Sequence, residues 1–172
     1  MTDPRMRRFA VPVAAFALMM AIVMATGAVL FARKIGFDPA RVRDFYLGSE
    51  AAFTQPRSLA GLLEVAVPHL LAVPLLVLVT VHLVAFAFGA RRHPLSVLVA
   101  LTWACVAVGI GAGFAIRFAW PGLAPLKVVA FVGTEATLAW WLALLAAAIV
   151  PPAPVAPSRL TERGAAPPRA AR

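Results

Sequence analysis

Residues 65–90 read VAVPHLLAVPLLVLVTVHLVAFAFGA, a run of 26 residues without Asp, Glu, Lys or Arg. A helix of roughly 20 apolar residues crosses a bilayer core, so this run is long enough to span a membrane. It contains two histidines, His69 and His82, thirteen positions apart. An imidazole in hydrocarbon needs a hydrogen-bond partner or a metal, because an unsatisfied polar group is costly there. These histidines are therefore the first candidates for a functional site.

Three further apolar segments accompany this run, at residues 9–32, 94–116 and 128–150. The chain of 172 residues is 62% hydrophobic and 13% charged, which excludes an ordinary soluble domain. We predict an all-α integral membrane four-helix bundle within residues 1–150, with spans near 9–32, 62–90, 94–118 and 124–150. Residues 151–172 are rich in Pro, Ala and Arg and are predicted to form a disordered tail.

The first segment follows the basic sequence MTDPRMRR, as the apolar part of a signal peptide would. Its apolar run is about twice the usual length for such a peptide. Arg33 and Lys34 close the run. We therefore predict a retained first span.

An even number of spans places both termini on one side of the membrane. The flanks on that side carry nine Lys and Arg residues, and the opposite flanks carry seven. The short turn GARRHP at residues 89–94 is basic, which is typical of a cytoplasmic loop. We predict a multi-pass protein of the bacterial inner membrane with both termini cytoplasmic. The basic residues that give the net charge of +9 then lie at the membrane edges, where they meet anionic headgroups. The sequence has no basic stripe with interleaved aromatic residues, so it does not predict nucleic-acid binding.

The segment between the first two spans, residues 33–58, predicts a short helix over residues 39–47. Asp38 fits an N-cap, Pro39 fits the first helical position, and Gly48 fits a C-terminal stop. We predict an amphipathic helix at the membrane interface that buries three side chains of one face, Val42, Phe45 and Tyr46. A surface anchor is the favoured role of this helix, and a docking site for a periplasmic partner is the alternative.

The third span carries small residues every four positions, Cys105, Gly109 and Gly113. This spacing predicts close packing against another helix. Close approach of a flat macrocycle is the alternative. Cys105 is the single cysteine, which excludes an intrachain disulfide and a C-x-x-C-H attachment of c-type haem.

The spacing of His69 and His82 favours two separate centres. Thirteen residues leave them about 140° apart around a straight helix and about 20 Å apart along it. The two side chains would face one groove only if the helix bends, and Pro74 between them favours a kink. From their separation along the helix we expect one centre in each leaflet.

Paired histidines thirteen to fifteen positions apart on one span are similar to the haem-ligand pattern of the cytochrome b family, whose bundles carry one haem near each membrane face. The stretch from Glu64 through His69, Pro74 and His82 also resembles small bacterial four-helix membrane proteins with a loop like YLGSE, residues 46–50, before the same kind of helix. The resemblance covers about residues 36–85. It implies b-type haem bound through the two histidines, for electron transfer within a respiratory or photosynthetic complex.

The chain departs from the cytochrome b pattern because two bis-histidine haems need four histidines and it has three. His93, at the start of the third span, falls in the same leaflet as His82 and is a candidate second ligand. For His69 the candidates are methionines of the first span, Met24, Met20 and Met19, because Met/His ligation of haem is established. Those methionines are otherwise gap-filling core residues. A homodimer or another membrane subunit is the remaining source of a ligand.

Two glutamates add polar groups to the spans. Glu135 lies near mid-depth in the fourth span, and Glu64 precedes His69 by five residues. A carboxyl group in a span must be neutral, paired or hydrated. We predict that Arg117, at the outer end of the third span, pairs with Glu64. Two roles remain open for these glutamates. One is a proton path or a contact with a quinone head, and the other is an ion pair that fixes helix register.

Three functions are compatible with these residues: a haem-binding electron-transfer subunit, a non-redox accessory or assembly subunit with structural histidines, and a small transporter. Transport is disfavoured because only the second span looks broken and no inverted repeat is visible. The absence of G-x-S-x-G, H-E-x-x-H and P-loop motifs disfavours a hydrolase. We expect the haem-binding subunit, with no enzymatic activity on its own, and keep the accessory subunit as the alternative.

Overall fold

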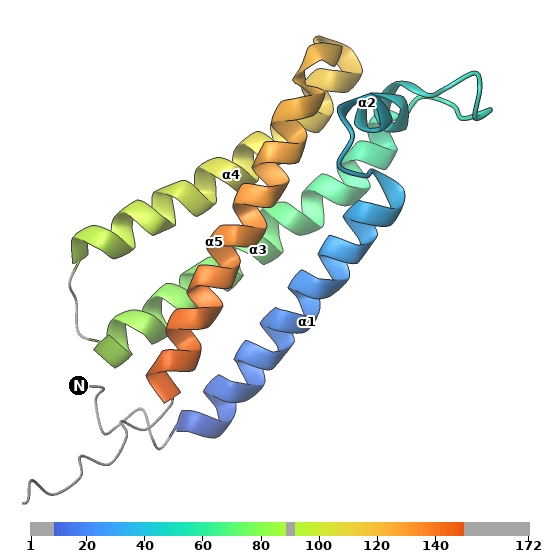
Figure 1. Ribbon diagram of the computed structural model, residues 1–172. Helices are drawn as coiled ribbons and strands as arrows, with labels where there is room; N and C mark the ends of the chain where they lie inside the picture. The colour runs from blue at the N-terminus through green and yellow to red at the C-terminus, as the bar shows by residue number, and fades with distance from the viewer. Residues whose placement is uncertain (1–8, 89–91, 150–172) are drawn as a thin grey trace, which may run out of the picture.

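The computed structural model describes residues 9–88 and 92–149, and over these ranges the chain is helical apart from short connections. Four long helices run alongside one another, and a short helix lies across one end of them (Figure 1). The elements are α1 (Ala10–Lys34), α2 (Pro39–Leu47), α3 (Leu59–Phe88), α4 (Arg92–Phe118), the 3-10 turn η2 (Pro121–Leu123) and α5 (Ala124–Ile149).

Each of the four long helices is long and apolar enough to cross a membrane. The predicted all-α membrane protein with four spans is therefore confirmed, and its environment is a lipid bilayer. The tail predicted for residues 151–172 lies outside the described residues. Helix α3 begins at Leu59, three residues before the predicted start, because Ser58 caps it: the Ser58 Oγ accepts a hydrogen bond from the Gly61 amide at 3.1 Å.

Helix α5 packs against the other three long helices. At the end remote from α2 the long helices enclose a hydrophobic cluster. It includes Met20 of α1, Val84 of α3, and Trp141 and Leu145 of α5, all of them buried. The indole of Trp141 donates a hydrogen bond to the Thr102 hydroxyl of α4 at 3.1 Å. Burying the tryptophan therefore leaves its N–H satisfied.

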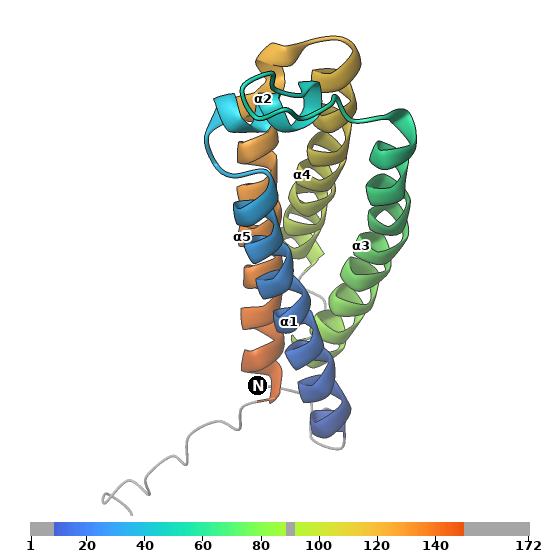
Figure 2. The same ribbon diagram turned by 90° about the vertical axis from the view of Figure 1, so that its right-hand side faces the viewer.

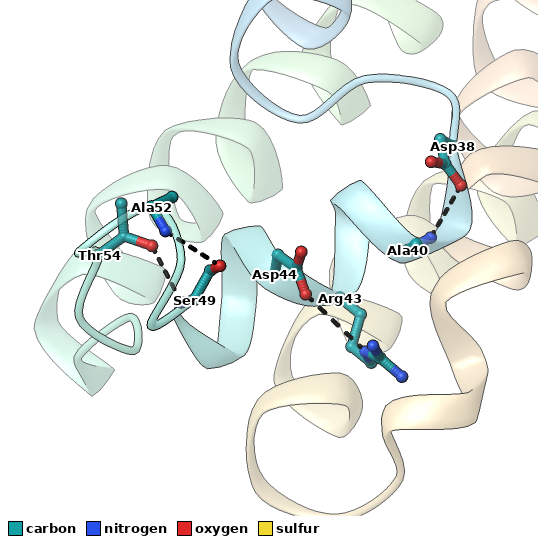
Figure 3. A network of polar contacts seen from close by, with 7 residues as sticks. All are labelled: Asp38, Ala40, Arg43, Asp44, Ser49, Ala52 and Thr54. Atoms are coloured by element: carbon teal, nitrogen blue, oxygen red, sulfur yellow. Dashed lines mark hydrogen bonds and ion pairs between the residues drawn. The ribbon is translucent and has the colours of Figure 1, made fainter.

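Helix α2 has the ends that the sequence predicts. The Asp38 carboxylate accepts a hydrogen bond from the Ala40 amide at 3.0 Å, and Pro39 occupies the first turn (Figure 3). Gly48 ends the helix with φ of 82°, a value that favours glycine. A Cβ at this position would lie 2.6 Å from the Thr54 carbonyl oxygen, so the turn needs glycine for space as well.

The apolar face of α2 is buried in protein. Val42 and Tyr46 are buried and Phe45 is half-buried, as predicted. Their cluster includes Leu62 of α3, Ile116 of α4 and Ala124 of α5. The predicted helix and its buried face are confirmed, while its roles as a surface anchor or as a docking site for a periplasmic partner stay predictions. It closes one end of the bundle, because the ends of the long helices offer it apolar surface.

The loop after α2 projects beyond the bundle (Figures 1 and 2). Ser49 and Thr54 pair through their backbones, and the Ala52 amide donates to the Ser49 hydroxyl at 3.4 Å (Figure 3). Phe53 has φ of 50° and is 95% exposed. A bulky side chain is thus held in a strained backbone conformation at the tip of the loop.

The small residues of α4 form a packing surface. A Cβ at Gly109 would lie 3.7 Å from Ala130 of α5, and one at Gly113 would lie 3.1 Å from the Tyr46 hydroxyl. Cys105 touches α5 as well, because a Cβ at Gly133 would lie 2.7 Å from its sulfur. The predicted packing role is confirmed, and protein occupies the space that the macrocycle alternative requires.

Candidate functional site

The two histidines of α3 make the same local hydrogen bond. The Nδ1 atom of His69 lies 2.7 Å from the Val65 carbonyl oxygen, and that of His82 lies 2.8 Å from the Leu78 carbonyl oxygen. A carbonyl oxygen only accepts, so each Nδ1 carries the hydrogen. In the neutral imidazole the Nε2 atom then keeps its lone pair, free to accept a hydrogen bond or to bind a metal.

Both imidazoles are exposed on the surface of the chain. The prediction that they point into the bundle is therefore wrong. The alternative, that they point into a groove covered by a partner, stays a prediction.

His82 faces away from the bundle. It lies about 160° around α3 from Thr80 and Val84 at the ideal 100° per residue. Both of those residues are buried. A side chain on this side of α3 therefore points away from the other helices of the chain.

His69 lies on the opposite side of α3 from His82. It falls within about 20° of Leu62 and Thr80 around an ideal helix. Both of those residues are buried, whereas His69 is exposed. Its position around the helix therefore does not decide its exposure, because the bundle leaves the His69 side chain uncovered at this level of α3.

Among the described residues, the candidate second ligands are the methionines of α1. Met20 is 1% exposed and belongs to the hydrophobic cluster around Trp141, which is the gap-filling role. Met24 is half-buried and packs against the same cluster, and Met19 is 55% exposed. The side chain of His93 lies outside the described residues. Among the described residues, no group of three or more His, Cys, Asp or Glu is arranged to hold a metal ion.

The predicted ion pair between Glu64 and Arg117 is wrong. The Nε atom of Arg117 donates a hydrogen bond to the Arg57 carbonyl oxygen at 2.8 Å, and its guanidinium lies over the Phe118 ring. Glu64 is exposed. The cause is the chain between α2 and α3, which carries the Arg57 carbonyl to the end of α4 and so offers Arg117 an acceptor.

Helix α5 carries two polar groups toward its neighbours. Glu135 is half-buried, and a Cβ at Gly27 of α1 would lie 3.8 Å from its Oε1. Lys127, which sequence reasoning treated only as a flanking charge, donates a hydrogen bond from Nζ to the Gly109 carbonyl oxygen of α4 at 2.7 Å. Its position between Ala124 and Ala130, both buried, was the signal that it points inward.

An open apolar groove of about 370 Å³ lies between α1 and α3. Its walls include Phe9, directly before α1, Phe16 of α1, and Val79 and Phe86 of α3. His82 stands three residues after Val79 and four before Phe86, so it is a surface neighbour of both wall residues. An imidazole with an unused Nε2 therefore borders the groove.

Comparison with known proteins places the chain in a family. No curated protein and no solved structure matches it. Residues 36–153 match the family Aq_1264_TM, described as a transmembrane helical domain. The match covers helices α2 to α5 and well over half of the chain, so the protein belongs to this family of transmembrane helical domains.

Proposed function

We propose that the protein is a membrane subunit that binds b-type haem through His69 and His82 and transfers electrons within a larger complex. The observation that carries the proposal is the shared hydrogen-bond pattern of the two imidazoles. Histidines that bind metals almost always donate their other ring N–H to a carbonyl, a carboxylate or water, which fixes the tautomer and raises the basicity of the ligating nitrogen. Both histidines have this arrangement.

The surroundings of each histidine fit a flat apolar group. His82 borders the groove whose walls include three phenylalanines, and His69 is exposed on the side of α3 opposite to His82. An Nε2 lone pair without a partner is unfavourable in hydrocarbon, and binding to iron would satisfy it. Haem iron with such axial ligands supplies one-electron transfer.

The second axial ligands come, in this proposal, from another chain. Met20 is committed to the hydrophobic cluster, and both imidazoles are exposed on the isolated chain. A second copy or a different membrane subunit that covers α3 would bring ligands to both. Exposed Glu64, on the same side of a straight α3 as His82, is then a proton acceptor or a contact for a quinone head. The setting we propose is a bacterial inner membrane, with both termini cytoplasmic.

The test is the haem content of protein purified with its complex from its own host. We expect a Soret band and a pyridine haemochrome spectrum of b-type haem. His69→Gln and His82→Gln should each remove about half of the haem, because glutamine does not bind haem iron as imidazole does. His82→Met should keep haem but raise its redox potential, since a thioether replaces one imidazole.

Protein of the same host that lacks haem in its intact complex would refute the proposal. The matched control is Thr26→Ala, which removes an exposed polar side chain from α1 and should leave the haem content unchanged. Loss of all haem from either single variant would indicate that the two histidines share one haem site and do not form two separate centres.

A non-redox accessory subunit is the second candidate. Its support is the outward direction of His82, since an Nε2 acceptor on the surface suits a hydroxyl or indole donor of a neighbouring subunit. In that case the purified complex would be colourless. His82→Ala would then weaken association with the neighbouring subunit without any spectral change.

A further inference from the structure

The side chain of Lys127 extends into the membrane span and not toward the nearby membrane surface. Lys127 stands three residues after the start of α5, a helix that is long and apolar enough to cross the membrane. Lysines near the ends of such helices usually reach back to the interface. The Nζ atom of Lys127 instead donates a hydrogen bond to the Gly109 carbonyl oxygen at 2.7 Å. Gly109 lies nine residues, or about 14 Å along α4, before the end of that helix at Phe118.

The hydroxyl of Tyr46 lies over the next turn of α4. A Cβ at Gly113, four residues after Gly109, would lie 3.1 Å from the Tyr46 hydroxyl oxygen. Tyr46 is only 5% exposed, and its hydroxyl makes no hydrogen bond with the described residues. Every fully buried polar side-chain atom in this part of the chain has a partner, so the hydroxyl oxygen is not completely enclosed. A small ligand can therefore reach it.

The ammonium and the phenol meet where three helices join. Tyr46 packs in one cluster with Ala124, which stands three residues before Lys127 on α5. Helix α2 contacts both α4 and α5. In an α-helix the amide of Gly113 bonds to the carbonyl of Gly109, so the two polar groups lie beside one hydrogen-bonded turn of α4. Two hydrogen-bond donors from α2 and α5 thus share one place.

The charge around this junction is positive. The Arg57 amide donates a hydrogen bond to the Tyr46 carbonyl oxygen at 3.0 Å. Burial raises the pKa of Tyr46, and the charge of Arg57 lowers it by a smaller amount, so Arg57 lies near the hydroxyl. Arg117 binds the Arg57 carbonyl oxygen. The ion pair found among the described residues lies within α2, so none of these three cations (Lys127, Arg57 and Arg117) pairs with a carboxylate there.

We propose that the Lys127 ammonium and the Tyr46 hydroxyl bind one small inorganic anion, such as chloride, between α2, α4 and α5. An ammonium inside a span without a counter-charge is unfavourable, and the anion supplies that charge. Arg57 and Arg117 raise the local concentration of anions. The burial of Tyr46 limits the occupant to an ion of one or a few atoms. The histidines of α3 take no part, so this proposal and that of haem binding are tested separately.

The experiment measures the binding of radiolabelled chloride to the purified full chain in detergent by scintillation proximity. Wild-type protein should show saturable binding of one chloride per chain. Lys127→Met keeps most of the side-chain volume and removes the charge, so it should weaken binding about tenfold or more. Lys34→Met is the matched control, because Lys34 is the other lysine of the chain and is exposed at the end of α1. It should bind chloride as the wild type does.

Two further measurements test the phenol and the size of the site. Tyr46→Phe keeps the buried ring and removes the hydroxyl, so it should weaken chloride binding several-fold through the loss of one hydrogen bond. This variant also tests the site if Lys127→Met fails to fold, which circular dichroism would reveal. Unlabelled bromide should displace the chloride, whereas gluconate, a much larger anion, should not.

Three results would overturn the proposal. Wild-type protein that shows no saturable chloride binding would exclude the site. Equal weakening by Lys127→Met and Lys34→Met would mean that overall positive charge attracts the anion. Displacement by gluconate as effective as that by bromide would exclude a site closed by α2.

Discussion

Helices α5 and α3 are both long apolar spans, yet they place polar groups in opposite ways. Two polar groups of α5 find partners on α4: Lys127 binds the Gly109 carbonyl, and Trp141 binds the Thr102 hydroxyl. Among the described residues, the imidazoles of α3 bond only to carbonyls of their own helix, and both are exposed. Helix α5 is thus tied to its neighbour within this chain, whereas α3 offers two ring nitrogens to something outside it.

This difference separates stability from function. Substitutions at the buried positions of α5 should destabilise the protein, because they remove contacts made within the chain. Substitutions on the exposed side of α3 should leave the fold intact and change what the protein binds. Four experiments test that division, and they are ordered from the largest expected effect to the smallest.

The largest effect is expected at Trp141, which is 0% exposed in the centre of the bundle. Trp141→Ala should lower the free energy of unfolding in detergent micelles by about 3–5 kcal/mol, through the cavity and the lost hydrogen bond. Trp140→Ala is the matched control on the next residue, which is 64% exposed, and should cost little. Similar losses for both variants would mean that α5 is not the centre of the bundle.

The next largest effect concerns Tyr46, which links α2 to α4. Burial raises the pKa of Tyr46 to about 12, against a smaller opposing effect of Arg57. The folded state therefore favours the neutral phenol, and its contribution to stability is complete below pH 10 and lost as the pH rises toward 12. A pKa two units above that of the unfolded chain corresponds to about 3 kcal/mol.

The measurement is the free energy of unfolding at pH 9 and pH 12 for wild type and Tyr46→Phe. Phenylalanine keeps the buried ring and removes the titrating group, so the difference between the two proteins isolates Tyr46. Parallel pH profiles for both would show that the phenol is hydrated and that α2 does not close the bundle.

A smaller effect is expected where α4 and α5 approach each other. Gly133→Ala should destabilise the protein by about 1–3 kcal/mol, because the added Cβ meets the Cys105 sulfur. Gly111→Ala is the control, since no atom lies within 4 Å of its added Cβ. In a Cys105→Ala background the cost of Gly133→Ala should largely disappear. An unchanged cost in that background would place the clash elsewhere.

The smallest effect on stability is expected at the histidines. His69→Leu and His82→Leu should change the unfolding free energy of the isolated chain by less than about 0.5 kcal/mol, as exposed substitutions usually do. Each removes a hydrogen bond confined to its own helix. A loss comparable to that of Trp141→Ala would mean that the imidazoles support the fold, and the division between α5 and α3 would fail.

The sequence by itself determined the elements of this protein. Long apolar runs predicted the four spans, and Asp38, Pro39 and Gly48 predicted α2, because capping and backbone preferences act within a few residues. The repeat of Cys105, Gly109 and Gly113 predicted a packing surface, because only small side chains let two helices approach closely.

Only the tertiary structure decided which sides of the spans are covered. In a spanning helix the positions that face lipid and those that face the bundle are both apolar, so periodicity does not tell them apart. The exposure of His69 follows from how the other helices pack around α3, the partner of Arg117 from the path of the chain through Arg57, and the inward bond of Lys127 from the position of Gly109. Each depends on residues far apart in the chain, and their proximity exists only once the helices have packed.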